Sequence, residues 1–257
     1  SGGSDSRGEG MTTVVLTRPQ ADSERLSTAL QHEGFQTRVM PIMTIEAIPP
    51  SDRAVAPAMT DTTLCIFISA NAVRFGLPQL GSELAGYPDL TVMAVGNKTR
   101  DTLAAKGIRA QVPARADSEG LLAMPALSAP DSREVVIVKG EGGRELLASE
   151  LTRRGARVTE WACYRRCWPD VDVSKLAEIS AGLIFQASSG EMLSRLAELL
   201  AGEGQVDLFQ SPIIVPSDRV ASLATEIGWT QVIRAEDASD GAFMYALKQH
   251  TQSGTDR

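Results

Sequence analysis

Residues 135–155 read VVIVKGEGGRELLASELTRRG, and residues 14–34, VVLTRPQADSERLSTALQHEG, align with them without a gap. In each stretch a β-branched apolar run leads into a short polar turn, and apolar residues then recur at three- and four-residue spacing. This order predicts a buried strand, a loop and an amphipathic helix. Both helical patterns end in glycine, which is a helix stop signal.

The turn KGEGGRE (139–145) resembles a nucleotide-binding loop but departs from both known fingerprints. The dinucleotide motif needs a third glycine where Glu145 stands, and no Gly-Lys-Ser/Thr of a P-loop follows. The first copy has Pro19 and Ala21 where the second has glycines, so the glycines are not essential to the repeated architecture. Nucleotide binding is therefore disfavoured, and the simpler interpretation is a strand–loop–helix turn with glycines for tight geometry.

The repeat continues along the chain at an offset of 118 to 121 residues. The further pairs are CIFISANAV (65–73) with LIFQASSGEM (183–192), VMAVGNKTRDTLAAKG (92–107) with IIVPSDRVASLATEIG (213–228), and DSEGLLAM (117–124) with ASDGAFMY (238–245). Solenoid repeats have periods of roughly 20–50 residues. The longer offset indicates a duplicated domain.

Strands and helices alternate along both halves. Short apolar runs that precede helical patterns lie at 13–17, 64–69, 91–95, 135–138, 183–186 and 213–215. Such alternation predicts parallel sheets covered by helices on both faces. We expect an α/β protein of two similar lobes, each a parallel sheet flanked by helices, joined by a two-stranded hinge with the active-site cleft between them.

The boundaries follow from two strand-like runs that end at proline instead of turning into a helix, RVMPIMTIEAIPP (38–50) and ARVTEWACYRRCWP (156–169). These runs could be the two crossings between lobes, with hinge strands at 39–49 and 160–169. Lobe 1 then combines residues 11–40 with 170–250, lobe 2 comprises 50–160, and 251–257 form a tail. The polar stretch SGGSDSRGEG (1–10) is interpreted as an expression-tag remnant.

Composition restricts the class of protein. The 43% hydrophobic content can build full cores, and no apolar run approaches the roughly 20 residues that span a membrane. A net charge of −7 disfavours nucleic-acid binding, which needs a basic face. Three cysteines, an odd number, and the absence of a visible secretory signal favour the reducing cytoplasm. We expect a monomer.

Few residues suit conventional catalytic machinery. The two histidines, His32 and His250, lie in polar surroundings and are interpreted as surface residues. Cys163-x-x-x-Cys167 lacks the second ligand pair of a zinc site, and Cys65 is interpreted as a small core residue. No Gly-x-Ser-x-Gly elbow is present. Metal-assisted hydrolysis and Ser/His/Asp chemistry are both disfavoured.

Polar residues instead gather where predicted strands end and helices begin. Ligands of open α/β sheets bind at these carboxyl ends, and helix N-termini attract anions. Ser, Thr and Asn are also the preferred helix N-caps, so each residue alone is as readily a cap as a ligand. Their number nevertheless suggests an anionic ligand held largely by backbone amides. The candidate binding residues are Arg18, Ser69, Asn71, Thr99, Lys139, Gly140, Arg144, Ser188, Ser189 and Ser217.

Over residues 13–248 the chain resembles the uroporphyrinogen-III synthase family. The matching stretches are VLTRP (15–19), FISANAV (67–73), AVGNKT (94–99), DSEGL (117–121) and GGRELLASELTRRGARVTEWACYRR (142–166). Each match is loose by itself, but their order and spacing together are specific. The resemblance implies two α/β lobes with a two-stranded linker, as the duplication also predicts.

The resemblance further implies closure of the linear tetrapyrrole hydroxymethylbilane to uroporphyrinogen III, with inversion of the last ring and loss of water. The family uses neither a metal nor an organic cofactor. Its tyrosine falls on Tyr164, which could be the general acid for the leaving hydroxyl or only a packing residue of the hinge.

Two departures weaken the carry-over of binding residues to the other half. Phe185-Gln186-Ala187 replaces the family's Phe-Thr-Ser, and Pro216-Ser217-Asp218-Arg219 replaces its Gly-x-x-Thr. A second interpretation is a non-enzymatic, two-lobed binding protein for a small anion.

Overall fold

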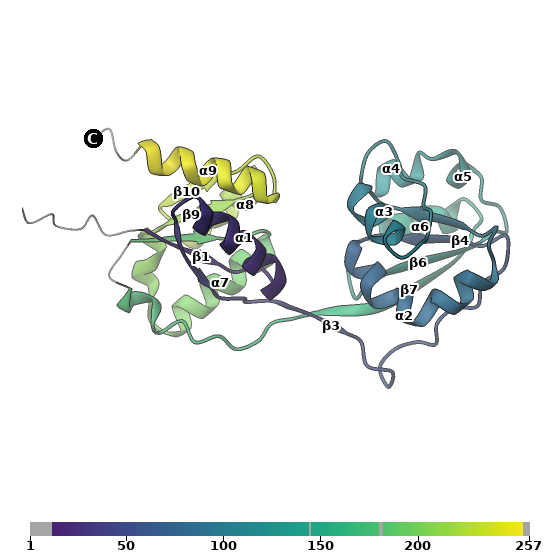
Figure 1. Ribbon diagram of the computed structural model, residues 1–257, viewed down its shortest axis with the longest axis horizontal. Helices are drawn as coiled ribbons and strands as arrows, with labels where there is room; N and C mark the ends of the chain where they lie inside the picture. The colour runs from purple at the N-terminus through teal and green to yellow at the C-terminus, as the bar shows by residue number, and fades with distance from the viewer. Residues whose placement is uncertain (1–11, 144, 180–181, 254–257) are drawn as a thin grey trace, which may run out of the picture. The chain divides into compact units, whose positions relative to one another are not determined.

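The chain forms two compact α/β units (Figure 1). The structure is a computed structural model, and it describes residues 12–143, 145–179 and 182–253. The first unit combines the residues up to Thr44 with those from Cys167 onward, and the second runs from Ile45 to Arg166. Each predicted strand run is confirmed as a strand, and the predicted α/β class is confirmed.

The first unit contains a five-stranded sheet in the order β10-β9-β8-β1-β2. Its strands pair in parallel, with Thr13 opposite both Gln36 and Leu183. When the sheet is read from its β2 edge and its strands are numbered by their order along the chain, the strand order is 2-1-3-4-5, that of a doubly wound sheet. The strands are β1 (Thr13–Leu16), β2 (Gln36–Val39), β8 (Leu183–Gln186), β9 (Pro212–Val215) and β10 (Gln231–Arg234). The helices are α1 (Gln20–His32), α7 (Gly190–Gly202), α8 (Asp218–Ile227) and α9 (Asp240–Ser253), with 3-10 turns at Leu176–Glu178 and Val206–Gln210.

The second unit contains a sheet in the order β3-β7-β6-β4-β5. The strands are β3 (Thr44–Ala47), β4 (Leu64–Phe67), β5 (Thr91–Ala94), β6 (Glu134–Gly140) and β7 (Arg157–Cys167). The helices are α2 (Ala70–Gly86), α3 (Asn97–Ala104), α4 (Ser118–Leu122), α5 (Pro125–Ser128) and α6 (Leu146–Arg153). β3 and β7, which hold parts of the two predicted hinge segments, are neighbours in this sheet, and the Ile48 N–H donates to the Cys163 carbonyl at 3.2 Å.

The two sheets repeat each other, as the internal duplication predicts. The run β7-β6-β4-β5 of the second unit corresponds to β2-β1-β8-β9 of the first. The parallel bridge between Met93 and Gln111 stands where β9 pairs with β10. The twin helices α1 and α6 are both followed by a glycine in the left-handed region, Gly34 at φ 87° and Gly155 at φ 92°. Glycine adopts this conformation without strain, which explains why both copies keep it.

Both faces of each sheet carry an apolar core. In β6, Val136 and Val138 pack with the buried side chains of α2, whereas Val135 and Ile137 pack with α4 and α6 on the other face. Strand side chains alternate between faces, so a strand buried on both sides reads as a continuous apolar run. Figure 1 shows the same sandwich of helix, sheet and helix in each unit.

Candidate active site

In each unit the connections that follow two neighbouring strands of the sheet diverge at the carboxyl ends of those strands. In the second unit, β4 leads into α2 and the adjacent β6 leads into α6, and these helices pack on opposite faces of the sheet. In the first unit, β8 and β1 lead into α7 and α1 in the same way. Ligands of open α/β sheets bind where neighbouring connections diverge like this.

A β-bulge determines where Tyr164 points. Lys139 of β6 lies opposite Ala162, but the next residue, Gly140, lies opposite Tyr164, so β7 holds one extra residue. Strict alternation from Trp161 would place Tyr164 on the opposite face of the sheet. The bulge instead leaves Cys163 and Tyr164 both in the core cluster of Trp161 and α2. Bulges of this kind are common next to active sites, where they re-aim a side chain.

The bulge brings the Tyr164 hydroxyl to the first turn of α2. Its oxygen lies 2.9 Å from Ser69 Oγ, and its ring is 5.8 Å from that of Phe75 at an interplanar angle of 32°. Gly140 makes room for the ring, because a Cβ at Gly140 would lie 2.6 Å from the Tyr164 ring carbons Cε2 and Cζ. In this glycine-rich turn, Gly140 therefore accommodates a tyrosine rather than forming a nucleotide fingerprint.

Ser69 has two functions at this point. It is the N-cap of α2, where its Oγ accepts the Ala72 N–H at 2.9 Å, and it also contacts Tyr164. A serine hydroxyl has one proton and two lone pairs. With one lone pair taken by Ala72, Ser69 can still donate its proton to the Tyr164 oxygen, which leaves the tyrosine proton free for a ligand. The sequence predicts Ser69 as a helix cap or a ligand contact. Its contact with Tyr164 is evident only from the tertiary structure.

Lys139 immediately precedes Gly140, which lies opposite Tyr164, but its side chain faces away from the tyrosine. The side chain is buried, and its Nζ donates to Glu160 Oε1 at 3.3 Å. Val138, its neighbour in β6, belongs to the Tyr164 cluster, so alternation places Lys139 on the other face. Its role in binding an anion stays a prediction.

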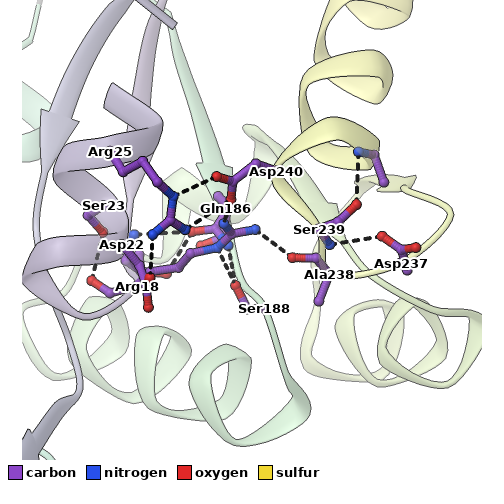
Figure 2. Close-up of polar contacts among 12 residues, drawn as sticks. Arg18, Asp22, Ser23, Arg25, Gln186, Ser188, Asp237, Ala238, Ser239 and Asp240 are labelled. Atoms are coloured by element: carbon purple, nitrogen blue, oxygen red, sulfur yellow. Dashed lines mark hydrogen bonds and ion pairs between the residues drawn. The ribbon is translucent and has the colours of Figure 1, made fainter. Parts of the chain in front are cut away.

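In the first unit, Arg18 follows the carboxyl end of β1 and is held by protein contacts (Figure 2). Its Nε donates to Ser188 Oγ at 2.9 Å, its Nη2 donates to the Ala238 carbonyl at 2.8 Å, and its Nη1 pairs with Asp240. The Asp240 carboxylate also accepts Arg25 Nε at 2.9 Å. Burial alone would raise the pKa of Asp240, but the hydrogen bonds from Arg25 and Arg18 outweigh it and lower that pKa.

Gln186, which replaces a threonine of the family pattern, completes this network. It is fully buried, its Oε1 accepts the Thr17 N–H at 3.3 Å, and its backbone carbonyl accepts Thr17 Oγ1 at 2.5 Å. Its amide also donates to Ser188 Oγ. The divergent second-half motif therefore joins the ends of β1 and β8 through buried hydrogen bonds. The importance of Gln186 and Asp240 was missed from the sequence, although the repeat aligns Asp240 with Glu119 at the same offset that aligns Arg18 with Lys139.

The other predicted site residues lie at helix N-termini. Ser189 and Ser217 cap α7 and α8, each accepting the backbone N–H three residues further on. Thr99 is buried in the first turn of α3, and the Asn71 side-chain oxygen accepts a hydrogen bond from Arg74 on the surface of α2. Arg144 lies outside the described residues.

The remaining titratable groups are unremarkable as catalysts. Cys65 and Cys163 are free thiols, and burial raises the pKa of both to about 12. Within the described residues, His, Cys, Asp and Glu side chains form no group of three that could hold a metal ion. None of the helices in the described part of the chain is long and apolar enough to cross a membrane.

This chain is similar to known proteins both in sequence and in fold. The family model described as uroporphyrinogen-III synthase HemD matches residues 24–244. The uroporphyrinogen-III synthase of Salmonella typhimurium is 31% identical over 92% of this chain and 100% of its own, and that of Escherichia coli is 30% identical over the same shares.

Solved structures agree at the level of the fold. The uroporphyrinogen-III synthetase of Helicobacter pylori superposes with a TM-score of 0.63 at 16% identity, covering 93% of this chain and 100% of that one. A mutant uroporphyrinogen III synthase of Thermus thermophilus has a TM-score of 0.59 at 18% identity, covering 94% and 99%. With the sequence relatives and the matched family model, these likenesses show that the chain belongs to the uroporphyrinogen-III synthase family.

Proposed function

We propose that the protein is a uroporphyrinogen-III synthase, a lyase of tetrapyrrole biosynthesis that closes hydroxymethylbilane to uroporphyrinogen III with inversion of the last ring and loss of water. Family membership supports the activity. The single structural observation that carries it is the contact of 2.9 Å between the Tyr164 hydroxyl and Ser69 Oγ at the carboxyl end of β4.

The first chemical step needs one proton at the hydroxyl of the substrate. In our proposal Tyr164 donates it as a general acid, the carbon–oxygen bond breaks and water leaves. The pyrrole nitrogen supplies the electron pair that forms the exocyclic double bond, giving a protonated azafulvene. Ser69 then donates a hydrogen bond that stabilises the phenolate oxygen, and the Ala72 N–H polarises Ser69 from the N-terminus of α2.

The second step sets the product isomer. The already substituted carbon of the last ring attacks the exocyclic carbon of the azafulvene, and the spiro intermediate that forms fragments and recloses with that ring inverted. The protein contributes by holding the chain so that this attack outpaces direct closure to isomer I, which is an effect of proximity and orientation. The cleft between the two units, where such a chain would bind, stays a prediction.

Binding of the substrate carboxylates is assigned mainly to backbone amides at helix N-termini. Arg18 already donates to three protein acceptors, so we propose that it stabilises the carboxyl ends of β1 and β8 and offers the ligand little beyond its charge. Ser188 and Ser189 in the first unit, and Asn71 and Thr99 in the second, remain proposed contacts. The same holds for Lys139, Gly140, Arg144 and Ser217.

Cytoplasmic location and a monomeric state are part of the proposal. The free thiols of Cys65 and Cys163 are consistent with a reducing compartment. The alternative of a non-enzymatic anion-binding protein is less well supported, because the family relatives bear the name of a synthase.

The test is incubation with hydroxymethylbilane, followed by oxidation of the products and chromatographic separation of isomers I and III. We expect isomer III to dominate with the protein and isomer I to dominate with buffer alone. Heat-denatured protein is the control for trace catalysis. Formation of isomer I alone, at the rate of the buffer control, would contradict the proposal.

A further inference from the structure

A cavity lies on the α2 side of the second unit. Its volume is about 770 Å³, within the range of about 300–1,000 Å³ that is usual for small-molecule sites. One wall is a face of α2 that includes Leu77 and Gly81. The other wall comes from the residues that lead into β5 and from the segment 106–109 that follows α3. Its floor is apolar, with Leu84, Leu90 and Val92 buried.

The charge at this cavity has one sign. Its lining includes Arg74, Lys106 and Arg109, all exposed, and no aspartate or glutamate. Among the described residues none of these three cations forms a salt bridge with a carboxylate, and Arg74 donates only to the neutral Asn71 side chain. A cluster of unpaired cations is unusual in a protein whose net charge is −7. The lining is therefore complementary to an anion with an apolar body.

The duplication provides an internal comparison. Gly107 and Ile108 align with Gly228 and Trp229 of the first unit. Trp229 is buried, and its ring packs against Phe185 at 5.4 Å and Phe209 at 5.0 Å. Phe209 comes from the 3-10 turn Val206–Gln210 between α7 and β9, whereas only residues 87–90 join α2 to β5. Aromatic rings therefore fill this place in the first unit, whereas the corresponding place beside Ile108 is open in the second unit.

We propose that this cavity is a binding site for a small organic anion, with the apolar body against Leu84 and Val92 and the acid group at the three cations. The far end of the site lies away from the Tyr164 hydroxyl, whereas Arg74 at its near end follows Ser69 by only five residues along α2. Gly81 follows Ser69 by twelve residues along α2, which corresponds to about 18 Å at a rise of 1.5 Å per residue. The proposal does not depend on the reaction that the protein catalyses.

Two probes that share an apolar body but differ in charge test the site on the full chain. Anilinonaphthalenesulfonate carries the anion, and phenylnaphthylamine is its neutral counterpart. Fluorescence titration should give one site for the sulfonate, bound about tenfold more tightly than the amine, because three partly solvated charge interactions together contribute on this scale. Equal affinity for the two probes would overturn the anionic character of the site.

Two glycines of α2 offer a matched pair of variants. A Cβ at Gly81 or at Gly86 would meet nothing within 4 Å, but only Gly81 lines the cavity. Gly81→Leu should fill the cavity and weaken both probes by at least about tenfold, whereas Gly86→Leu should leave them within about twofold. Unchanged binding by Gly81→Leu, or equal loss in both variants, would overturn the assignment.

Charge and filling are tested separately. The double variant Lys106→Gln, Arg109→Gln should weaken the sulfonate about fivefold and leave the amine unchanged. Ile108→Trp introduces the residue type of the aligned Trp229 and should also displace both probes. This variant serves as the test if Gly81→Leu does not fold. Retained sulfonate affinity in the double variant would overturn the role of the cations.

Discussion

Removal of the Tyr164 hydroxyl separates chemistry from packing at the candidate active site. In Tyr164→Phe the ring keeps its contact with Phe75 and its place over Gly140, and Ser69 Oγ still accepts the Ala72 N–H. Only one neutral hydrogen bond is lost, which is expected to cost about 1 kcal/mol of unfolding free energy. For a chain of this length the melting temperature should fall by roughly 2–4 °C.

Activity should fall much further than stability. General acid catalysis accounts for about 10²–10⁴-fold in rate, equivalent to about 2.7–5.4 kcal/mol of transition-state stabilisation. The assay is the initial rate of isomer III formation from hydroxymethylbilane, with isomer I measured in the same chromatogram. We expect isomer I to accumulate in the variant, because the substrate can still lose its hydroxyl and close spontaneously.

A companion variant tests the partner of the tyrosine. Ser69→Ala removes both the helix cap and the contact with Tyr164, and should lower stability by about 1 kcal/mol and turnover by about tenfold. Ser69→Thr keeps the hydroxyl and should restore most of the turnover. Near-normal isomer III formation by Tyr164→Phe would refute the proton-donor role and leave the shape of the site and its backbone amides as the catalyst.

Three further predictions concern the surrounding structure. Gly140→Ala should displace the Tyr164 ring, because the added carbon would lie 2.6 Å from it. We expect the free energy of unfolding in urea to fall by about 1–3 kcal/mol and turnover to decrease. A variant with unchanged stability and turnover would contradict the close approach. Asp240→Asn should destabilise the protein by roughly 2 kcal/mol at neutral pH, because it leaves Arg18 without its counter-charge. The loss is smaller than for a fully buried ion pair because Asp240 is partly solvated. The folded state lowers the pKa of Asp240, so this stabilisation is present above the ordinary aspartate pKa of about 3.9 and is lost as the pH falls through the lowered value. The unfolding free energies of the unchanged protein and Asp240→Asn should therefore converge in acid. A difference between them that stays constant with pH would disprove the linkage. Of the three thiols, only Cys167 should react with a disulfide reagent in the folded protein, because burial raises the pKa of the other two to about 12; fast labelling of more than one thiol would argue against it.

The strand ends that carry the candidate site residues were predictable from local pattern. Strand runs such as 135–138 and 213–215 are apolar throughout because their strands are buried on both faces, and glycines such as Gly34 and Gly155 mark helix ends. Residues that follow a strand and open a helix must lie at the carboxyl edge of a parallel sheet. For this reason Ser69, Ser189 and Ser217 could be placed at that edge from the sequence.

The partners of these residues were not predictable in the same way. Arg18 was expected to face an anionic ligand, but it donates to Ser188 and pairs with Asp240, which is 222 residues away. Lys139, its counterpart in the repeat, pairs with Glu160 instead. Equivalent positions therefore acquire different partners, because an ion pair depends on which side chains the fold brings within reach.

By itself, the sequence determined that the chain is a duplicated α/β protein, because the apolar periodicity and its repeat at 118 to 121 residues record local structure directly. Only the tertiary structure decided that Tyr164 faces Ser69. The side of a sheet on which a residue lies depends on register, and one extra residue in β7 opposite β6 reverses it. That register is fixed by pairing between separate strands and by the space that Gly140 leaves, neither of which a pattern along one strand contains.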